Sequence, residues 1–182
     1  MQPCNPVTAL TFTMAPQVVP RILVIGYGNP SRRDDGLGPA FAARLEALRL
    51  PGVTVESDYQ LVIEHAHLAA QHDIVVFADA AADIDDQSPF YFRSVKPAPE
   101  DRYSSHSISP QAVLRLAAQC FGVRPRGWLL GIRPMDLESF AEGLTPDAEA
   151  HLSAALTSFR EAVESGRLAP REGDSDKTPD AP

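Results

Sequence analysis

The chain has 182 residues, which suits one ordinary domain and is too short for two. Its 24 Asp and Glu outnumber its 16 Lys and Arg, giving a formal net charge of −8, and 44% of the residues are hydrophobic. This hydrophobic content suffices for a core and excludes a wholly disordered chain. Because the chain is acidic and its arginines are scattered, we expect no nucleic-acid binding.

The sequence also predicts a cellular compartment. No segment approaches the roughly 20 apolar residues that a membrane-spanning helix requires. Residues 1–20 carry no charge and so lack the positive start of a secretory signal. The two cysteines, Cys4 and Cys120, cannot form a disulfide framework, and we expect Cys120 on the buried face of a helix. We therefore expect a cytoplasmic protein with no membrane partner.

Composition divides the chain into three parts. Residues 1–20 are rich in proline, and residues 169–182 are polar without a large apolar side chain. We expect a flexible leader at 1–20, one α/β domain at 21–168 and a disordered tail at 169–182.

Within 21–168, apolar runs alternate with helical patterns. Ser109-Pro110 and Thr145-Pro146 are typical helix starts, each with a capping hydroxyl before a first-turn proline. The near-continuous apolar strands predict a three-layer α/β/α sandwich on a mostly parallel, twisted sheet. In chain order we expect a strand at 21–27, a helix at 37–48, a strand at 53–57, a helix at 62–70, strands at 73–79 and 90–95, a helix at 110–121, a strand at 127–132 and a helix at 145–165.

Polar side chains follow the expected strands, where binding sites form in such sheets. Asp35 follows the first strand, Asp79 ends the third, and His106 precedes the Ser109 cap. Two carboxylates and one imidazole suit nickel or zinc with a position left open for substrate. Each residue also has a structural alternative. Asp34 and Asp35 could cap the following helix, whose N-terminus favours negative charge. Asp79 could cap the next loop, and His106 could be an ordinary loop histidine.

We expect the turn after the first strand, GYGNPS, to shape the loop that carries Asp35. Gly26 and Gly28 allow a sharp turn, and Asn29 can hydrogen-bond its own backbone. Ser31 stands where a dinucleotide-binding loop has its third glycine, and the following acids would repel a pyrophosphate. A nucleotide-binding α/β enzyme is therefore the weaker alternative. His65 and His67 point about 200° apart on a helix, cannot share a metal ion, and are expected at the surface or half-buried.

Four segments in order resemble the nickel–iron hydrogenase maturation endopeptidases, across residues 21–166. They read ILVIGYGNPSRRDDGLGP, VVFADA, SSHSISPQAVLRLA and GLTPDAEAHLSAAL. The resemblance implies a cytoplasmic α/β/α peptidase, a hydrolase that removes the C-terminal extension of a hydrogenase large-subunit precursor after nickel insertion. In that family a carboxylate of the first loop, the Asp after the third strand and a His before the next helix bind nickel. Those roles fall on Asp35, Asp79 and His106.

Two departures from the family pattern accompany the resemblance. Asp35 stands where some members have Glu, which shortens the carboxylate but keeps the ligand type. The loop SDYQLVIEHAH replaces a Gly-Gly pair of many members and resembles the branch that serves cytosolic NAD-linked bidirectional hydrogenases.

Several points stay open at this stage. The nickel would come with the precursor, and either the metal or an aspartate would activate the water. A non-catalytic nickel-binding chaperone would use the same three ligands, and a small single domain would be compatible with a monomer.

Overall fold

The computed structural model describes residues 19–85, 87–98 and 108–168. The expected leader at 1–20, but for its last two residues, and the expected tail at 169–182 therefore lie outside the described residues. The described chain follows the predicted order βαβαββαβα, with one added turn of 3-10 helix, η1. The elements are β1 (Ile22–Tyr27), η1 (Arg33–Gly36), α1 (Leu37–Leu48), β2 (Val53–Asp58), α2 (His65–Ala69), β3 (Ile74–Ala80), β4 (Phe90–Val95), α3 (Pro110–Phe121), β5 (Arg126–Ile132) and α4 (Pro146–Glu164).

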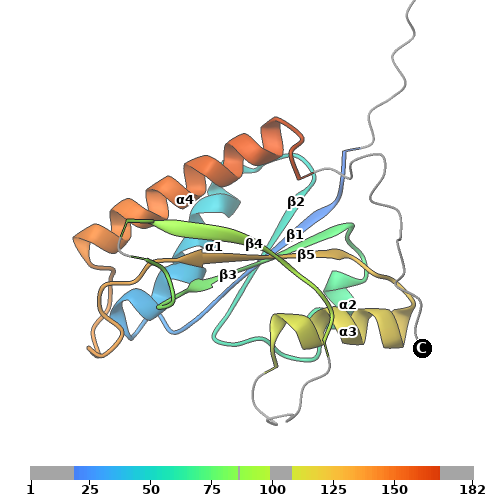
Figure 1. Cartoon of the computed structure of the whole chain (residues 1–182), viewed down its shortest axis with the longest axis horizontal. Helices are drawn as coiled ribbons and strands as arrows, with labels where there is room; N and C mark the ends of the chain where they lie inside the picture. Colours follow the sequence, from blue (N-terminus) through green and yellow to red (C-terminus); the bar gives the residue numbers. More distant parts are fainter. Residues whose placement is uncertain (1–18, 86, 99–107, 169–182) are drawn as a thin grey trace, which may run out of the picture.

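The five strands form one sheet in the order β2-β1-β3-β5-β4 (Figure 1). β2, β1, β3 and β5 pair in parallel, and β4 pairs antiparallel with β5 at the edge. This confirms the predicted mostly parallel sheet. The carboxyl ends of four strands consequently meet at one edge, where the loops that carry the candidate site residues begin.

Helices cover both faces of the sheet, which confirms the three-layer sandwich (Figure 1). α1 and α4 pack on one face against Val24, Val76 and Leu130. α2 and α3 pack on the other against Leu23 and Phe77. Successive strand residues alternate between the two cores, as the two-residue period of a strand requires. Both faces of the central strands are therefore buried, which explains why their sequences read as continuous apolar runs.

The predicted helix caps are confirmed. The Ser109 side chain accepts a hydrogen bond from the Ala112 N–H at 3.2 Å, and the Thr145 hydroxyl accepts one from the Ala148 N–H at 3.3 Å. Each cap satisfies a backbone donor that the first helical turn leaves free. α3 ends at Gly122, whose φ of 69° is left-handed.

Two predictions of burial are wrong. Cys120 is exposed, because it lies in the last turn of α3, where the neighbouring Phe121 is also 45% exposed. His65 is buried, and its Nδ1 accepts a hydrogen bond from the Val62 N–H at 3.0 Å. His67, two residues later, is exposed as expected. Among the described residues, no helix is both long and apolar enough to cross a membrane.

Candidate active site

Asp79 lies near the carboxyl end of the central strand β3 and is partly buried. Its Oδ1 accepts a hydrogen bond from the Ala80 N–H at 2.8 Å, which fixes the side chain. Burial raises the pKa of Asp79 to about 6, because desolvation disfavours the charged form. Hydrogen bonding from the Tyr27 hydroxyl and from Ala80 opposes this rise, and the negative charge of Asp35 adds to it.

Asp79 opens into a surface pocket of about 440 Å³. The pocket is bounded by the ends of β1, β3 and β5, by edge strand β4 and by the first turn of α3. A cavity of this size at the carboxyl edge of a parallel sheet is the usual place for a binding site. Its lining residues are Tyr27, Asp79, Ala80, Ala81, Ala82, Asp83, Tyr91, Pro110, Gln111, Leu129 and Gly131.

Asp35 lies in η1, the short turn between β1 and α1, which contacts β3. Its Oδ2 accepts a hydrogen bond from the Asn29 N–H at 3.2 Å. The Asn29 side chain in turn accepts one from the Ser31 N–H at 2.9 Å, the local turn expected from the sequence. The GYGN turn therefore does more than reverse the chain, since it holds the carboxylate of Asp35.

The two glycines of the GYGN turn serve different purposes. Gly28 has a φ of 138°, and a Cβ there would collide with the backbone oxygen of Asp35. Gly26 lies inside β1 rather than in the turn, and a Cβ there would collide with the backbone of Gly38 in α1. Gly26 thus lets α1 approach the sheet, which differs from the turn-forming role expected of it.

Asp34, the neighbour of Asp35, is fully buried and faces the opposite loop. Its carboxylate accepts hydrogen bonds from the backbone of Met135, Asp136 and Thr145 and from the Thr145 hydroxyl. These bonds hold the pKa of Asp34 below its ordinary value, against the opposing effect of burial, which is the larger single influence. No side chain caps η1 or α1, so Asp34 does not cap the next helix, which was the structural alternative for this residue.

The third expected site residue, His106, lies outside the described residues. The structure places Asp35 in η1, which contacts β3, and Asp79 in β3 itself, and it does not test the convergence of either residue with His106. The helix that follows His106 begins at Pro110, and Pro110 and Gln111 line the same pocket as Asp79.

The described residues supply a donor set of two carboxylates. Within residues 19–85, 87–98 and 108–168, no three His, Cys, Asp or Glu side chains gather closely enough to hold a metal ion. A pair of carboxylates, one of them partly desolvated, is a ligand type that divalent cations accept, but a third ligand has to come from elsewhere.

Two tyrosines of the pocket were missed by the sequence analysis. Tyr27 ends β1 and hydrogen-bonds to Asp79, and burial raises the pKa of its hydroxyl above the ordinary value. Tyr91 comes from edge strand β4 and faces Gly131 of β5, where the missing side chain leaves room for the ring. Tyr27 could have been found as the last residue of a buried strand. Tyr91 could not, because its position depends on where β4 pairs.

Two polar residues that follow β5 have structural roles. Arg133 donates to the Asp85 carbonyl at 3.2 Å and lies 3.2 Å from the ring of His151. Asp136 accepts hydrogen bonds from the Glu138 and Ser139 N–H groups, both at 3.0 Å, and so closes its own loop. Neither residue lines the Asp79 pocket.

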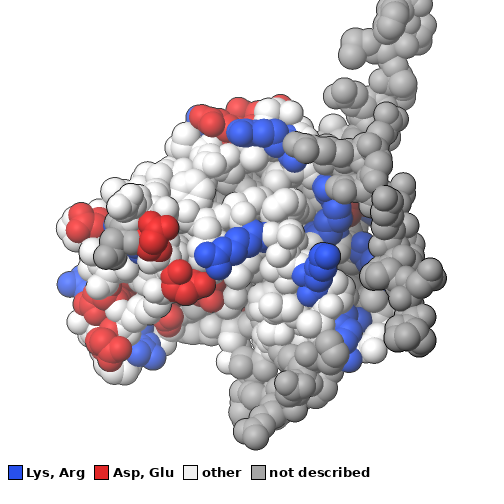
Figure 2. Space-filling model, viewed as in Figure 1, with Lys and Arg blue, Asp and Glu red and all other residues white. Residues whose placement is uncertain are grey.

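The surface near this edge of the sheet is acidic. Figure 2 shows most acidic side chains of the visible face at the end where α4 begins, with a few Lys or Arg side chains among them, and a smaller acidic group at the other end of α4. A negative field around a pocket raises the local concentration of cations and of positively charged segments.

Comparisons with known proteins find similar solved structures. No known family profile matches the sequence, and no curated protein sequence matches it significantly. The hydrogenase maturating endopeptidase HybD from E. coli is 27% identical, over 80% of this chain and 93% of its own, with a TM-score of 0.63. An endopeptidase from E. coli, solved in solution, is 25% identical over 82% and 99%, with a TM-score of 0.59.

A third solved structure shares the fold. It is the [NiFe] hydrogenase maturation protease HycI from Thermococcus kodakarensis, 22% identical over 79% of this chain and 92% of its own, with a TM-score of 0.62. The α/β/α fold and the likeness to the two E. coli enzymes together define a peptidase, and thus a hydrolase. The chain is therefore similar in fold to the hydrogenase maturation endopeptidases, and it is 27% identical in sequence to one of them, HybD from E. coli.

Proposed function

We propose that the protein cleaves the precursor of a nickel–iron hydrogenase large subunit in the cytoplasm, removing its C-terminal extension after nickel has been inserted. The nickel belongs to the substrate, and Asp35, Asp79 and His106 bind it as the recognition step. The observation that carries this proposal is the pair of carboxylates, Asp79 in its pocket with the charge of Asp35 beside it. The NAD-linked branch of hydrogenases is the substrate group that we propose from the loop at 57–67.

Nickel recognition would explain how an acidic site selects one peptide bond. A metal held on the folded precursor and bound by the enzyme fixes the adjacent chain in the pocket, which raises the effective concentration of the scissile bond. When present, nickel supplies Lewis-acid polarisation of a nearby carbonyl.

Hydrolysis adds water across the peptide bond. The water oxygen joins the carbonyl carbon, the C–N bond breaks, and a proton passes from the water to the leaving nitrogen. This requires a group that accepts and returns a proton, which works best when its pKa lies near the working pH. Asp79, whose pKa in the metal-free site is about 6, is the group in the described site that suits this role when it is not bound to nickel.

The test is to incubate the full-length protein with a nickel-loaded large-subunit precursor and measure the precursor mass. Loss of a C-terminal fragment, absent with nickel-free precursor and absent with the Asp79→Asn variant, is the expected result. Metal-dependent binding without any change in mass would identify a chaperone instead. An active Asp79→Asn variant would overturn the assignment of the site.

A further inference from the structure

Asp34 joins two loops that are more than a hundred residues apart in the sequence. Its Oδ2 accepts hydrogen bonds from the Met135 N–H at 2.7 Å, the Asp136 N–H at 2.9 Å and the Thr145 hydroxyl at 2.8 Å. Its Oδ1 accepts one from the Thr145 N–H at 2.7 Å. A carboxylate with no exposed surface is costly unless its oxygens are satisfied, so this geometry is tightly determined.

Further contacts fasten the same two loops. The Asp34 N–H donates to the Asp136 carbonyl at 3.1 Å, and the Arg33 N–H donates to the Ala141 carbonyl at 2.8 Å. The Arg32 guanidinium donates to the Leu137 carbonyl at 3.0 Å. Arg33 has a φ of 47°, a left-handed conformation that a non-glycine residue adopts at a cost, so the surrounding bonds must hold it in place.

This anchoring sets the direction of Asp35. In a 3-10 helix successive side chains are about 120° apart, so adjacent residues face different partners. With Asp34 fixed on the loop that follows β5, Asp35 is turned toward the Asn29 N–H, and η1 contacts β3, the strand that carries Asp79.

We propose that Asp34 is a positioning residue, which holds the carboxylate of Asp35 beside Asp79 by locking the loop after β1 to the loop after β5. The proposal rests on the proposed function, in which Asp35 and Asp79 bind the cation carried by the substrate. Asp34 itself faces backbone donors and touches neither the cation nor the peptide.

Cadmium binding to the full-length protein tests this proposal independently of cleavage. Isothermal titration calorimetry with Cd²⁺ compares the wild type, Asp35→Asn, Asp34→Asn and the double variant. Asp34→Asn keeps the shape of the side chain but places an amide N–H against a donor, because all four partners of Asp34 donate. Ile74→Ala is the control: it removes a buried side chain at the opposite end of β3 and lowers stability without touching either loop.

We expect Asp35→Asn and Asp34→Asn each to weaken Cd²⁺ binding by about tenfold or more, the range typical of residues that orient a ligand. The double variant should bind no more weakly than Asp35→Asn alone, because Asp34 acts through Asp35. Ile74→Ala should keep the wild-type affinity. A structural role alone would leave the affinity of folded Asp34→Asn unchanged or make the two effects additive, and either result overturns the proposal.

The outcomes also separate this proposal from the proposed function. If Asp35→Asn binds Cd²⁺ like the wild type, both fail, because Asp35 is then no ligand. If only Asp34→Asn binds normally, the positioning role fails and the site stands. If Asp34→Asn does not fold, Thr145→Val takes its place, because it removes one of the four donors to Asp34. Thr145→Val should weaken Cd²⁺ binding less than Asp35→Asn does. Thr145→Ser keeps the hydroxyl and should bind Cd²⁺ like the wild type. Equal affinities of Thr145→Val and the wild type would then overturn the proposal.

Discussion

The carboxylate of Asp35 lies close enough to Asp79 for its negative charge to raise the pKa of Asp79. Burial of Asp79 is the larger cause, and both influences disfavour its ionised form. The folded chain thus holds an acid in an environment that opposes its ionisation, an arrangement that occurs frequently at functional sites.

The first prediction concerns the ionisation of Asp79 in the free enzyme. Carboxyl carbon chemical shifts measured by NMR across pH 3 to 9 should show Asp79 titrating with a midpoint near 6. Asp35→Asn should lower this midpoint, because it removes the neighbouring negative charge. A midpoint near the ordinary value of about 4 in the wild type would show that Asp79 is better solvated than its pocket indicates.

The second prediction is that Asp79→Asn stabilises the fold at neutral pH. Asp79 has a higher pKa folded than unfolded, so the folded state holds an extra proton between about pH 4 and 6, and its stability falls as pH rises through that window. The full penalty is present at pH 7. Urea unfolding should therefore give Asp79→Asn about 2–3 kcal/mol more stability at pH 7, and little difference at pH 3.5.

The matched control for this measurement is Glu142→Gln, which removes one negative charge from an exposed loop residue. It should change stability by less than about 0.5 kcal/mol at either pH. An equal gain in the control would assign the effect to net charge instead of to the buried site.

The third prediction concerns the close approach of α1 to the sheet. A Cβ on Gly38 would collide with the backbone oxygens of Tyr27 and Ala78, which neighbouring strands hold in place. Gly38→Ala should destabilise the protein by about 1–3 kcal/mol and displace the start of α1, which begins two residues after Asp35. Thermal unfolding and a cleavage assay check both effects. Ala43→Ser, on the exposed face of the same helix, should alter neither, and an unaffected Gly38→Ala would contradict the packing described.

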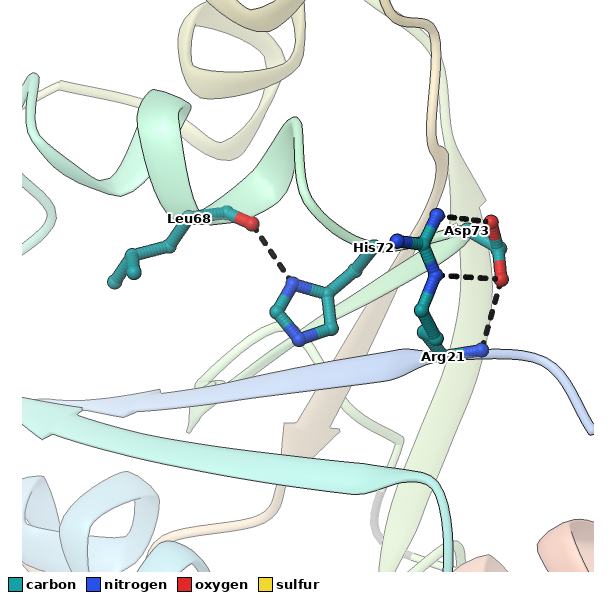
Figure 3. Close-up of polar contacts among 4 residues, drawn as sticks. All are labelled: Arg21, Leu68, His72 and Asp73. Carbon is teal, nitrogen blue, oxygen red and sulfur yellow. Dashed lines mark hydrogen bonds and ion pairs between the residues drawn. The ribbon is translucent and has the colours of Figure 1, made fainter.

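The fourth prediction concerns acid stability at the opposite edge of the sheet. The Asp73 carboxylate accepts hydrogen bonds from the Arg21 backbone N–H at 2.8 Å and from its guanidinium at 3.0 Å (Figure 3). Hydrogen bonding to Arg21 is the main cause that lowers the pKa of Asp73. The stabilisation is therefore fully present above about pH 4 and is lost as pH falls through the lowered pKa.

Asp73→Asn should accordingly be slightly less stable than the wild type at pH 7 and equally stable near pH 2. The effect is small because both side chains are about half exposed, and solvent screens the pair. Arg21→Gln should give the same loss, and the double variant no further loss. A difference between Asp73→Asn and the wild type that persists at pH 2 would exclude the ion pair as its source.

The fifth prediction is that the thiol of Cys120 takes no part in the reaction. Cys120 is exposed in the last turn of α3 and does not line the Asp79 pocket. Cys120→Ser should change stability by less than about 0.5 kcal/mol and leave cleavage of the precursor intact. Loss of cleavage in this variant would point to a thiol mechanism.

Local sequence signals predicted most of the fold. The capped starts at Ser109 and Thr145 and the strand at 90–95 are found where the sequence indicates, because caps and apolar periodicity are properties of neighbouring residues. The antiparallel edge position of β4 is not such a property, since it depends on pairing with a strand that follows about 30 residues later. The place of Tyr91 in the pocket follows from that pairing.

Within the site, the sequence could not separate Asp34 from Asp35. The two acids are adjacent and chemically identical. What distinguishes them is the set of donors at 135, 136 and 145, which only the folded chain brings to Asp34. The exposure of Cys120 was also beyond local patterns, because the helical period marks one face of α3 but does not show that its last turn is exposed.

The position of β5 between β3 and β4 has a consequence for synthesis of the protein. β3 and β4 leave the ribosome first, yet they are not sheet neighbours, and the strand that joins them is made only with residues 126–132. Until then β3 keeps an unpaired edge of buried apolar residues, which is prone to association with other chains. The Asp79 pocket also lacks the wall formed by Leu129 and Gly131. The strand order therefore delays assembly of the pocket until β5 has been made.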